Sequence, residues 1–334
     1  MTTVRAARFH AWGAAPIVED VPEPKPVPDP GHVLVEISAA AVAHLDVTIS
    51  SGNFGMRPEL PYIGGVEGAG IILASDPADP AAPQPGTQVL LRGAGLGMKR
   101  DGTWAERVIV PTRAAMPLPR HLPLPPETAA TFFVPATTAY VALHDVARLE
   151  KDEEVIVVGA AGAVGSMVVQ QALAAGARVT AVVSRADRVP HIPEGATTVI
   201  SSDSDTHTDS DTDTITRLTT TRPADVLIDT IGGRNLVART RWVRPGGRAV
   251  AIGYTAGAQT ELDLPSWLLD DVSLLPVNMI RRERRAREIA TDLIKDLADG
   301  TLHMTVQQFP LADAARALNQ LTAGHIHGRA VLIP

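Results

Sequence analysis

A short apolar run followed by three evenly spaced glycines constrains the fold of this chain more than any other feature. Residues 155–158 read Val-Ile-Val-Val, and Gly159, Gly162 and Gly165 follow directly before a stretch of helical periodicity. A continuous apolar run indicates a strand buried on both faces, as in a parallel sheet. The glycines indicate a tight turn from strand to helix, where backbone amides and the positive end of the helix face an anion.

This turn predicts a dinucleotide site in a doubly wound α/β domain, although a plain tight turn without a ligand is the alternative. Gly162 would let the backbone approach a pyrophosphate, and Gly165 would let the helix pack closely on the strand. Because the spacing departs from Gly-x-Gly-x-x-Gly, the prediction depends on the alternating strands and helices that follow. The residues expected to hold the cofactor at the turn are Gly159, Ala161, Gly162, Ala163, Val164 and Gly165.

The end of the next predicted strand, 178–183, selects between the two nicotinamide dinucleotides. Proteins that bind NAD place an acidic residue there for the ribose 2′-hydroxyl, whereas NADP requires space and cations for the 2′-phosphate. Here the strand is followed by Ser184 and Arg185, and Arg188 comes one turn later. A hydroxyl and two guanidinium groups suit a phosphate, which a carboxylate would repel. We therefore expect NADP(H), with Asp187 capping the following turn.

The residues before 126 predict a different, β-rich domain, because short apolar runs there are joined by Pro- and Gly-rich turns. Irregular joins favour a barrel or curled sheet over a parallel one. Two amphipathic helices and a final strand are expected to complete this domain, at 281–300, 311–321 and 328–334. The predicted domains are therefore residues 1–125 together with 280–334, and residues 126–279.

Composition excludes several classes of function. The 334 residues include no cysteine, which excludes disulfides, thiolate zinc sites, iron–sulfur clusters and a catalytic thiol. The formal net charge of −7 predicts no binding to nucleic acid or anionic membranes, and the basic run 281–287 is interpreted as a solvated helix face. The Asp-, Ser- and Thr-rich stretch 201–214 predicts a solvated loop, with calcium binding as a weaker alternative. Without a signal or membrane-spanning segment, a cytoplasmic protein is expected.

Five stretches together resemble the medium-chain dehydrogenase/reductase superfamily over essentially the whole chain, and most closely its zinc-free quinone oxidoreductase branch. They are GGVEGAG at 64–70, PATTAY at 135–140, the glycine turn, DTIGG at 229–233 and GRAVLIP at 328–334. The resemblance implies a GroES-like catalytic domain built from both chain ends, with a Rossmann domain between them. The strand predicted at 272–277 is apolar and lies at the edge of the sheet, where members of the resembled family commonly form dimers. We therefore predict a homodimer joined through this strand.

The residues at the zinc positions of this family predict a metal-free site. Zinc-dependent relatives use a Cys, a His before the Glu of a Gly-His-Glu motif, and a third Cys or Asp, whereas here the His position is Val66 and no Cys exists. An alkyl side chain cannot coordinate zinc. Without that Lewis acid, an alkoxide is hard to stabilise. Hydride addition to a conjugated C=C bond instead places charge on a carbonyl oxygen that needs only hydrogen-bond donors.

Candidate donors for that oxygen lie in the first domain. The segment 43–50 occupies the place where quinone oxidoreductases read Asn-x-x-Asp-x-Tyr-x-Arg, and of these residues only Asp46 is present. His44 is new to the stretch, and it could donate to a substrate oxygen or supply a proton, with packing as the alternative. Tyr62 is a further candidate donor, with an aromatic packing role as the alternative. Glu67 is interpreted as a buried structural carboxylate.

The resemblance implies further contacts to the cofactor. Thr138 is expected at the nicotinamide, and Asn278 at its carboxamide. Gly253 and Tyr254 follow a strand at its carboxyl end, where such sheets bind ligands. Arg329 is expected near the cofactor phosphates. For Tyr254 and Arg329, an exposed side chain without such a contact is the alternative.

These observations predict an NADPH-dependent reductase of an enone- or quinone-type small molecule. Two alternatives stay open. One is an NADPH-dependent carbonyl or imine reductase of a specialised biosynthetic pathway, in which His44 protonates the acceptor. The other is a dinucleotide-binding protein without turnover, which the loss of the usual Asn, Tyr and Arg from the segment 43–50 would permit.

Overall fold

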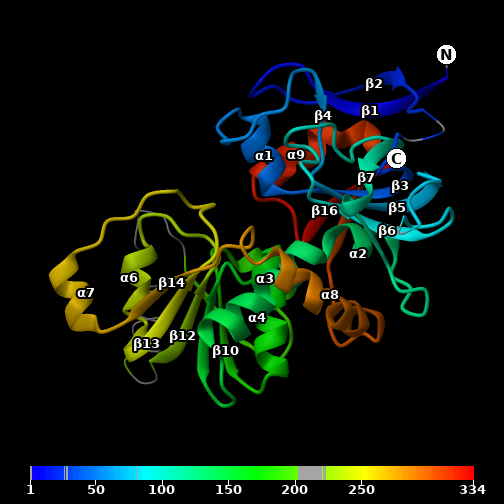
Figure 1. Ribbon diagram of the computed structural model, residues 1–334. Helices are drawn as coiled ribbons and strands as arrows, with labels where there is room; N and C mark the ends of the chain where they lie inside the picture. Colours follow the sequence, from blue (N-terminus) through cyan, green and yellow to red (C-terminus); the bar gives the residue numbers. More distant parts are fainter. Residues whose placement is uncertain (1, 26, 28, 81, 202–219, 221–222) are drawn as a thin grey trace. The chain divides into compact units, whose positions relative to one another are not determined.

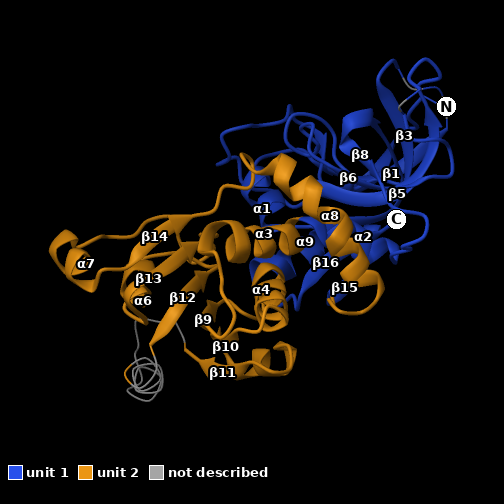
Figure 2. Cartoon of the chain, turned by 60° about the horizontal axis from the view of Figure 1, so that its bottom comes forward, with its two compact units in different colours: residues 1–133, 304–334 blue, residues 134–303 orange. Residues whose placement is uncertain are grey.

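The computed structural model describes residues 2–25, 27, 29–80, 82–201, 220 and 223–334 (Figure 1). The chain divides into two compact units: residues 1–133 with 304–334 form unit 1, and residues 134–303 form unit 2 (Figure 2). Of the polar stretch 201–214, only Ser201 falls within the described residues. No helix in the described ranges is long and apolar enough to cross a membrane.

Unit 1 contains a larger sheet to which both ends of the chain contribute. Its strand order is β15-β16-β3-β5-β6-β8, and β7 also pairs with β3. The C-terminal strand β16 pairs antiparallel with β3, which places the end of the chain inside the first domain as predicted. The strands are β3 (His32–Val42), β5 (Glu67–Ser75), β6 (Gln88–Arg92), β7 (Arg107–Pro111), β8 (Ala115–Pro117), β15 (Val306–Pro310) and β16 (Arg329–Ile333).

A smaller sheet in unit 1 contains two strands that the sequence did not predict, β1 (Thr3–Phe9) and β2 (Ile17–Pro22). β1 pairs antiparallel with β2 and with β4 (Tyr62–Ile63). Arg5 and Arg8 interrupt the apolar pattern of β1, and they form ion pairs at its surface while the residues between them are buried. The helical segments of the unit are α1 (His44–Ser50), η1 (Thr112–Ala114), α2 (Pro126–Thr131), η4 (Leu311–Asp313) and α9 (Ala314–Thr322).

Unit 2 contains a six-stranded parallel sheet in the order β11-β10-β9-β12-β13-β14 (Figure 2). This doubly wound order, with its reversal at β9, confirms the predicted α/β fold class. The strands are β9 (Glu154–Val158), β10 (Arg178–Val183), β11 (Thr197–Ile200), β12 (Ala224–Asp229), β13 (Val243–Ala251) and β14 (Ser273–Pro276). The helical segments are α3 (Phe133–Tyr140), the π-helix η2 (Val141–Ala147), α4 (Ala163–Ala174), η3 (Ala186–His191), α6 (Leu236–Thr240), α7 (Leu264–Asp270) and α8 (Glu283–Ala298).

The boundary between the units differs from the predicted one, because α8 belongs to unit 2 rather than to the first domain. Arg285 of α8 pairs with Asp145 of η2 through contacts of 3.1 and 3.3 Å. Farther along, the amide of Gln170 donates to the carbonyl of His303 at 3.0 Å. These contacts join residues far apart in sequence, so the amphipathic pattern of the helix could not show which domain it covers.

Candidate functional site

The glycine turn between β9 and α4 is tightly enclosed by neighbouring side-chain and backbone atoms. Gly159 has φ +74°, a left-handed conformation that favours glycine, and a Cβ there would lie 2.3 Å from the Thr230 hydroxyl oxygen. A Cβ on Gly165 would lie 2.2 Å from the Gly159 carbonyl oxygen. Gly162 is less enclosed, because its Cβ would lie 3.2 Å from the same oxygen. The two outer glycines are therefore required by the fold of the turn itself.

Gly162 is the N-cap residue of α4, and no side chain caps this helix end. The first amides of a helix have no partner within the helix, so their positive potential is available to an anion. The predicted residues Ala161, Ala163 and Val164 lie in the same turn and first helical turn, where small or alkyl side chains leave the backbone accessible. The turn thus has the shape and polarity that a pyrophosphate group needs.

The carboxyl ends of β9, β12 and β13 are linked by close backbone contacts. The Thr230 hydroxyl donates to the carbonyl of Val158 at 2.8 Å. A Cβ on Gly253 would lie 2.2 Å from the Thr230 carbonyl oxygen. Gly253 therefore lets the segment after β13 approach the end of β12. Tyr254, the next residue, is 61% exposed, which leaves its ring free to cover a bound molecule.

An unpredicted ion pair fixes the turn after β12. The buried carboxylate of Asp229 accepts hydrogen bonds from the backbone of Ile231 and Gly232, and Arg239 Nε donates to it at 2.7 Å. The same guanidinium donates to the Gly232 carbonyl at 2.6 Å. Asp229 belongs to the DTIGG stretch at 229–233, but nothing in the sequence indicated that Arg239 is its partner. The pair holds the loop beside Gly253 in one conformation.

Thr138 on α3, which is predicted to contact the nicotinamide, has a buried hydroxyl. Its side chain is 3% exposed, and its Oγ1 has no hydrogen-bond partner among the described residues. A buried hydroxyl without a partner is costly, so a bound molecule that supplied a hydrogen-bond partner would stabilise it. α3 also contacts α4, because Gln171 Nε2 donates to the Ala136 carbonyl at 3.0 Å. The residues of unit 2 therefore fit a nicotinamide dinucleotide.

The predicted phosphate residues lie after β10. Ser184 and Arg185 are exposed, and Arg188 is half-buried on η3. The Arg185 guanidinium forms two hydrogen bonds to Asp187, at 3.1 and 3.2 Å. Asp187 thus engages Arg185 directly, a contact that the predicted capping role did not include.

Asn278, predicted at the carboxamide, lies in the exposed turn after β14. Its side-chain oxygen accepts a hydrogen bond from the backbone N–H of Arg281 at 3.1 Å. This contact stabilises the turn before α8, and the amide nitrogen of Asn278 remains the group that could reach a ligand.

In unit 1, Asp46 joins two segments of the candidate catalytic region. Its buried carboxylate accepts the backbone N–H of Ala43 at 2.8 Å and that of Val66 at 3.1 Å. Burial raises the pKa of Asp46 to about 7, and the nearby Glu67 adds to this, while the hydrogen bonds and Arg329 act in the opposite direction. Asp46 therefore holds α1 against the segment that contains Val66, which makes it a positioning residue.

Glu67 is buried, as predicted, and its carboxylate forms an ion pair with Arg329. Arg329 Nη2 donates to Glu67 Oε2 at 2.9 Å, and Arg92 Nε lies 3.9 Å from Glu67 Oε1. Arg92 was not predicted; its guanidinium lies 4.2 Å above the ring of Phe133. Arg329 is expected near the cofactor phosphates; within unit 1 its guanidinium has the Glu67 carboxylate as a partner, because β16 and β5 both pair with β3.

His44 begins α1 with its side chain exposed. Desolvation by the surrounding atoms lowers the pKa of His44, and the positive charge of Arg329 adds to this. The lowered pKa favours the neutral imidazole, which can donate one hydrogen bond and accept another.

Tyr62, the other candidate donor, is 3% exposed and belongs to an aromatic cluster. Its ring stacks on Phe9 at a centroid distance of 5.2 Å and meets Trp12 at 5.9 Å. Burial raises the pKa of Tyr62 far above its usual range, and the charge of Asp46 adds to this. The aromatic packing role that the sequence left as an alternative is the one this geometry favours.

The described residues contain no cluster of three or more His, Cys, Asp or Glu side chains that could hold a metal ion. At the sequence position where zinc-dependent relatives place a His, the chain has the 6% exposed side chain of Val66.

Comparison with known proteins identifies the family. Residues 29–120 match the alcohol dehydrogenase GroES-like domain, and residues 163–296 match the zinc-binding dehydrogenase model. Together these matches cover most of the chain. The protein belongs to the medium-chain dehydrogenase/reductase superfamily, a family of oxidoreductases, and is quinone oxidoreductase-like. The predicted family is thereby confirmed.

Individual relatives are distant. The chain is 25% identical over 309 residues to the putative quinone oxidoreductase YhfP of Bacillus subtilis, covering 90% of this chain and 89% of that protein. It is 28% identical over 242 residues to prostaglandin reductase-3 of Bos taurus, covering 72% of this chain. The chain spans 60% of that reductase and less than two thirds of other curated relatives. Its fold is similar to that of Escherichia coli quinone oxidoreductase complexed with NADPH, with a TM-score of 0.83, 22% identity and coverage of 99% and 100%.

Proposed function

We propose that this protein is a zinc-independent oxidoreductase that uses NADPH to reduce an activated C=C bond in a small enone- or quinone-type molecule. The observation that carries the proposal is the buried hydroxyl of Thr138, which has no hydrogen-bond partner in the described part of the chain and lies in the same unit as the uncapped glycine turn before α4. A quinone oxidoreductase and a prostaglandin reductase among its relatives support reduction of conjugated acceptors.

The preference for NADPH is supported by the residues after β10. Ser184 stands at the position where an acidic residue would hold an unphosphorylated ribose. Arg185 and Arg188 follow on the same exposed segment, and guanidinium groups bind phosphates through paired hydrogen bonds. A solved structure of the same fold was obtained with NADPH, in agreement with this assignment.

Independence from zinc is supported by the residues that replace its ligands. The sequence has no Cys, and Val66 stands at the His position. The polar groups next to Val66 serve the chain itself, since Asp46 accepts its backbone N–H and Glu67 pairs with Arg329. Zinc needs three protein ligands in a catalytic site, and this arrangement supplies none of the family's set.

A bound reduced nicotinamide would supply the hydride. The chain's own residues would then hold the acceptor and stabilise charge on its carbonyl oxygen. His44 can donate a hydrogen bond to that oxygen from the exposed start of α1. Because the lowered pKa of His44 disfavours the protonated imidazole, we assign the proton for the product carbon to solvent in this scheme.

Steady-state oxidation of NADPH with an α,β-unsaturated ketone, followed by mass-spectrometric analysis of the products, tests this proposal. We expect the saturated ketone. An allylic alcohol, or an amine from an imine substrate, would favour carbonyl or imine reduction instead. NADPH binding without turnover on any of these acceptors would favour a non-catalytic binding protein. His44→Ala is expected to lower turnover with little change in NADPH affinity, and unchanged turnover would assign His44 to packing.

We also propose a homodimer through the segment 272–277. β14 is the last strand in the order of the six-stranded sheet, and an edge strand can pair with a second copy. Sedimentation equilibrium at several protein concentrations measures the mass in solution; a monomer at all of them would contradict this proposal.

A further inference from the structure

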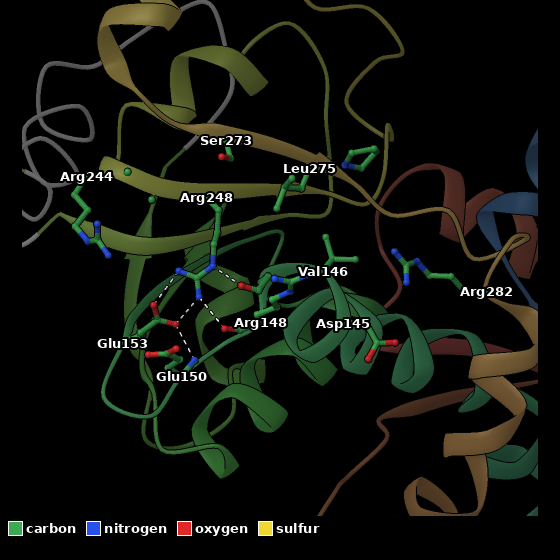
Figure 3. A pocket seen from close by; sticks show the side chains of 14 residues that line it. Asp145, Val146, Arg148, Glu150, Glu153, Arg244, Arg248, Ser273, Leu275 and Arg282 are labelled. Carbon is green, nitrogen blue, oxygen red and sulfur yellow. Dashed lines mark hydrogen bonds and ion pairs between the residues drawn. The ribbon is translucent and has the colours of Figure 1, made fainter.

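A cavity of about 770 Å³ in unit 2 lies apart from the glycine turn (Figure 3). Its lining comes from the end of η2, the loop before β9, the first half of β13, β14 and the residue before α8. None of the residues 159–165 lines it. Its volume lies within the range of pockets that hold small molecules, about 300–1,000 Å³.

The wall formed by η2 has an unusual backbone. η2 is a seven-residue π-helix, and it ends at Arg148 with φ 52° and ψ 54°. π-Helical segments are frequent at functional sites, and a non-glycine residue in the left-handed region is strained. Arg248 holds this end in place, because its guanidinium donates to the carbonyl of Arg148 at 3.1 Å and to Glu153 at 2.6 and 2.8 Å (Figure 3).

Most charges that line the cavity are already paired. Asp145 pairs with Arg285, Glu153 with Arg248, and Arg244 with Asp225. The remaining charged side chains in the lining are Arg148, Arg282 and Glu150, and the described residues give none of these three side chains an ion-pair partner. Arg282 is half-buried, and Figure 3 shows its side chain extending from the α8 end toward Asp145 and Val146.

The charge of Arg282 is not explained by the fold. It is the N-cap residue of α8, where a positive charge opposes the helix dipole and lowers helix stability. A cation kept half-buried at such a place, without a carboxylate partner, is suited to an anion from outside the chain.

The cavity lies on one face of β14, whereas the proposed homodimer would pair along the backbone edge of that strand. Ser273 and Leu275 line it, whereas Leu274 packs against the core of unit 2 on the other side of the strand. Pairing along the backbone edge of β14 therefore does not require these side chains.

We propose that this cavity is a second ligand site, which takes a phosphorylated small molecule that also carries hydroxyl groups. Arg148 and Arg282 bind the phosphate, because guanidinium groups match its oxygens. The Glu150 carboxylate accepts hydrogen bonds from the hydroxyls, since an ionised carboxylate is an acceptor only. Glu150 repels the phosphate of either molecule, but only the ester offers sugar hydroxyls to Glu150 in return, so the site favours a phosphate ester over inorganic phosphate.

Isothermal titration of the full-length protein with ribose 5-phosphate tests this site, with inorganic phosphate and ribose as comparison ligands. We expect saturable binding of one ribose 5-phosphate per chain, weaker binding of phosphate and none of ribose. Arg148→Gln and Arg282→Gln are each expected to weaken binding by about tenfold or more, the scale of a lost charge-assisted hydrogen bond. Arg120→Gln removes the same charge from an exposed position in unit 1 and serves as the matched control, with unchanged affinity.

A repeat titration in the presence of saturating NADPH separates this cavity from the cofactor site. Undiminished binding supports the second site. Loss of binding in NADPH or in Arg185→Ala would place the ligand at the cofactor site and overturn the proposal. Equal affinity in all the arginine variants, or equal affinity for phosphate and ribose 5-phosphate, would overturn it as well. Thermal unfolding of each variant confirms that the folded protein is compared.

Discussion

Arg329 Nη2 donates to Glu67 Oε2 at 2.9 Å across 262 residues of sequence, within a buried region of unit 1. The contact joins β16, near the C-terminus, to the first residue of β5. It therefore links the C-terminal segment to the segment that contains Val66. Removing one partner leaves the other charge buried, which costs more than the pair itself contributes.

Arg329→Met is expected to lower the free energy of unfolding by about 3 kcal/mol, because the buried Glu67 would lose its 2.9 Å partner and keep the weaker 3.9 Å contact with Arg92. Urea denaturation measures this change. The double variant Arg329→Met/Glu67→Gln should recover part of the loss, since it removes both charges. Equal stability of the single variant and the native chain would show that the ion pair does not stabilise unit 1.

The glycines of the turn separate folding from cofactor binding. Gly165→Ala is expected to destabilise the protein by about 2 kcal/mol, because its Cβ would lie 2.2 Å from the Gly159 carbonyl oxygen. Gly162→Ala should change stability by less than about 1 kcal/mol, since its contact is 3.2 Å and its φ of −76° suits alanine. It should nevertheless weaken NADPH binding by about tenfold, as measured by fluorescence titration. Native NADPH affinity in Gly162→Ala would contradict the pyrophosphate assignment.

Thr138→Val tests whether the unpartnered hydroxyl serves a ligand. The change keeps the shape and removes a buried oxygen without a partner, so the free energy of unfolding should stay equal or rise by about 1 kcal/mol. Turnover with NADPH should fall by about tenfold if that hydroxyl contacts the cofactor. Full activity in a stable variant would assign Thr138 to packing alone.

Arg185 and Asp187 provide opposite variants of one contact. Arg185→Ala should weaken NADPH far more than NADH, because only NADPH carries the 2′-phosphate. Asp187→Asn removes the carboxylate that engages Arg185, so NADPH affinity should rise. Both dissociation constants can be measured for each variant. Equal losses for NADPH and NADH in Arg185→Ala would refute the phosphate role.

Asp46 makes stability depend on pH in the direction opposite to most carboxylates. Its pKa is raised from 3.8 to about 7 by burial, so the folded protein binds this proton more tightly than the unfolded chain. Its contribution to stability is present at acidic pH and is lost as the pH rises toward about 7. Urea denaturation from pH 4 to pH 8 should show a flatter profile for Asp46→Asn than for the native chain. Parallel profiles would show that Asp46 ionises normally.

The sequence predicted unit 2 well because its signals are local. The strand predicted at 178–183 is β10 at its observed bounds, and the glycine turn marked the start of α4. The strands of unit 1 were predicted less completely from the alternation of apolar and polar residues. Arg5 and Arg8 hid the alternation of β1, since an outward arginine on a half-buried strand looks the same in sequence as a polar loop residue.

By itself, then, the chain's sequence determined the family, the doubly wound domain, the absence of cysteine ligands and the likeness of residues 184–188 to a phosphate site. Only the tertiary structure decided which charges meet. It paired Arg329 with Glu67, Arg185 with Asp187 and Arg239 with Asp229. It also left the Thr138 hydroxyl buried without a partner in the described chain. Strand and helix periodicity arises between near neighbours, whereas the burial and pairing of a charge depend on segments that approach only when the chain has folded.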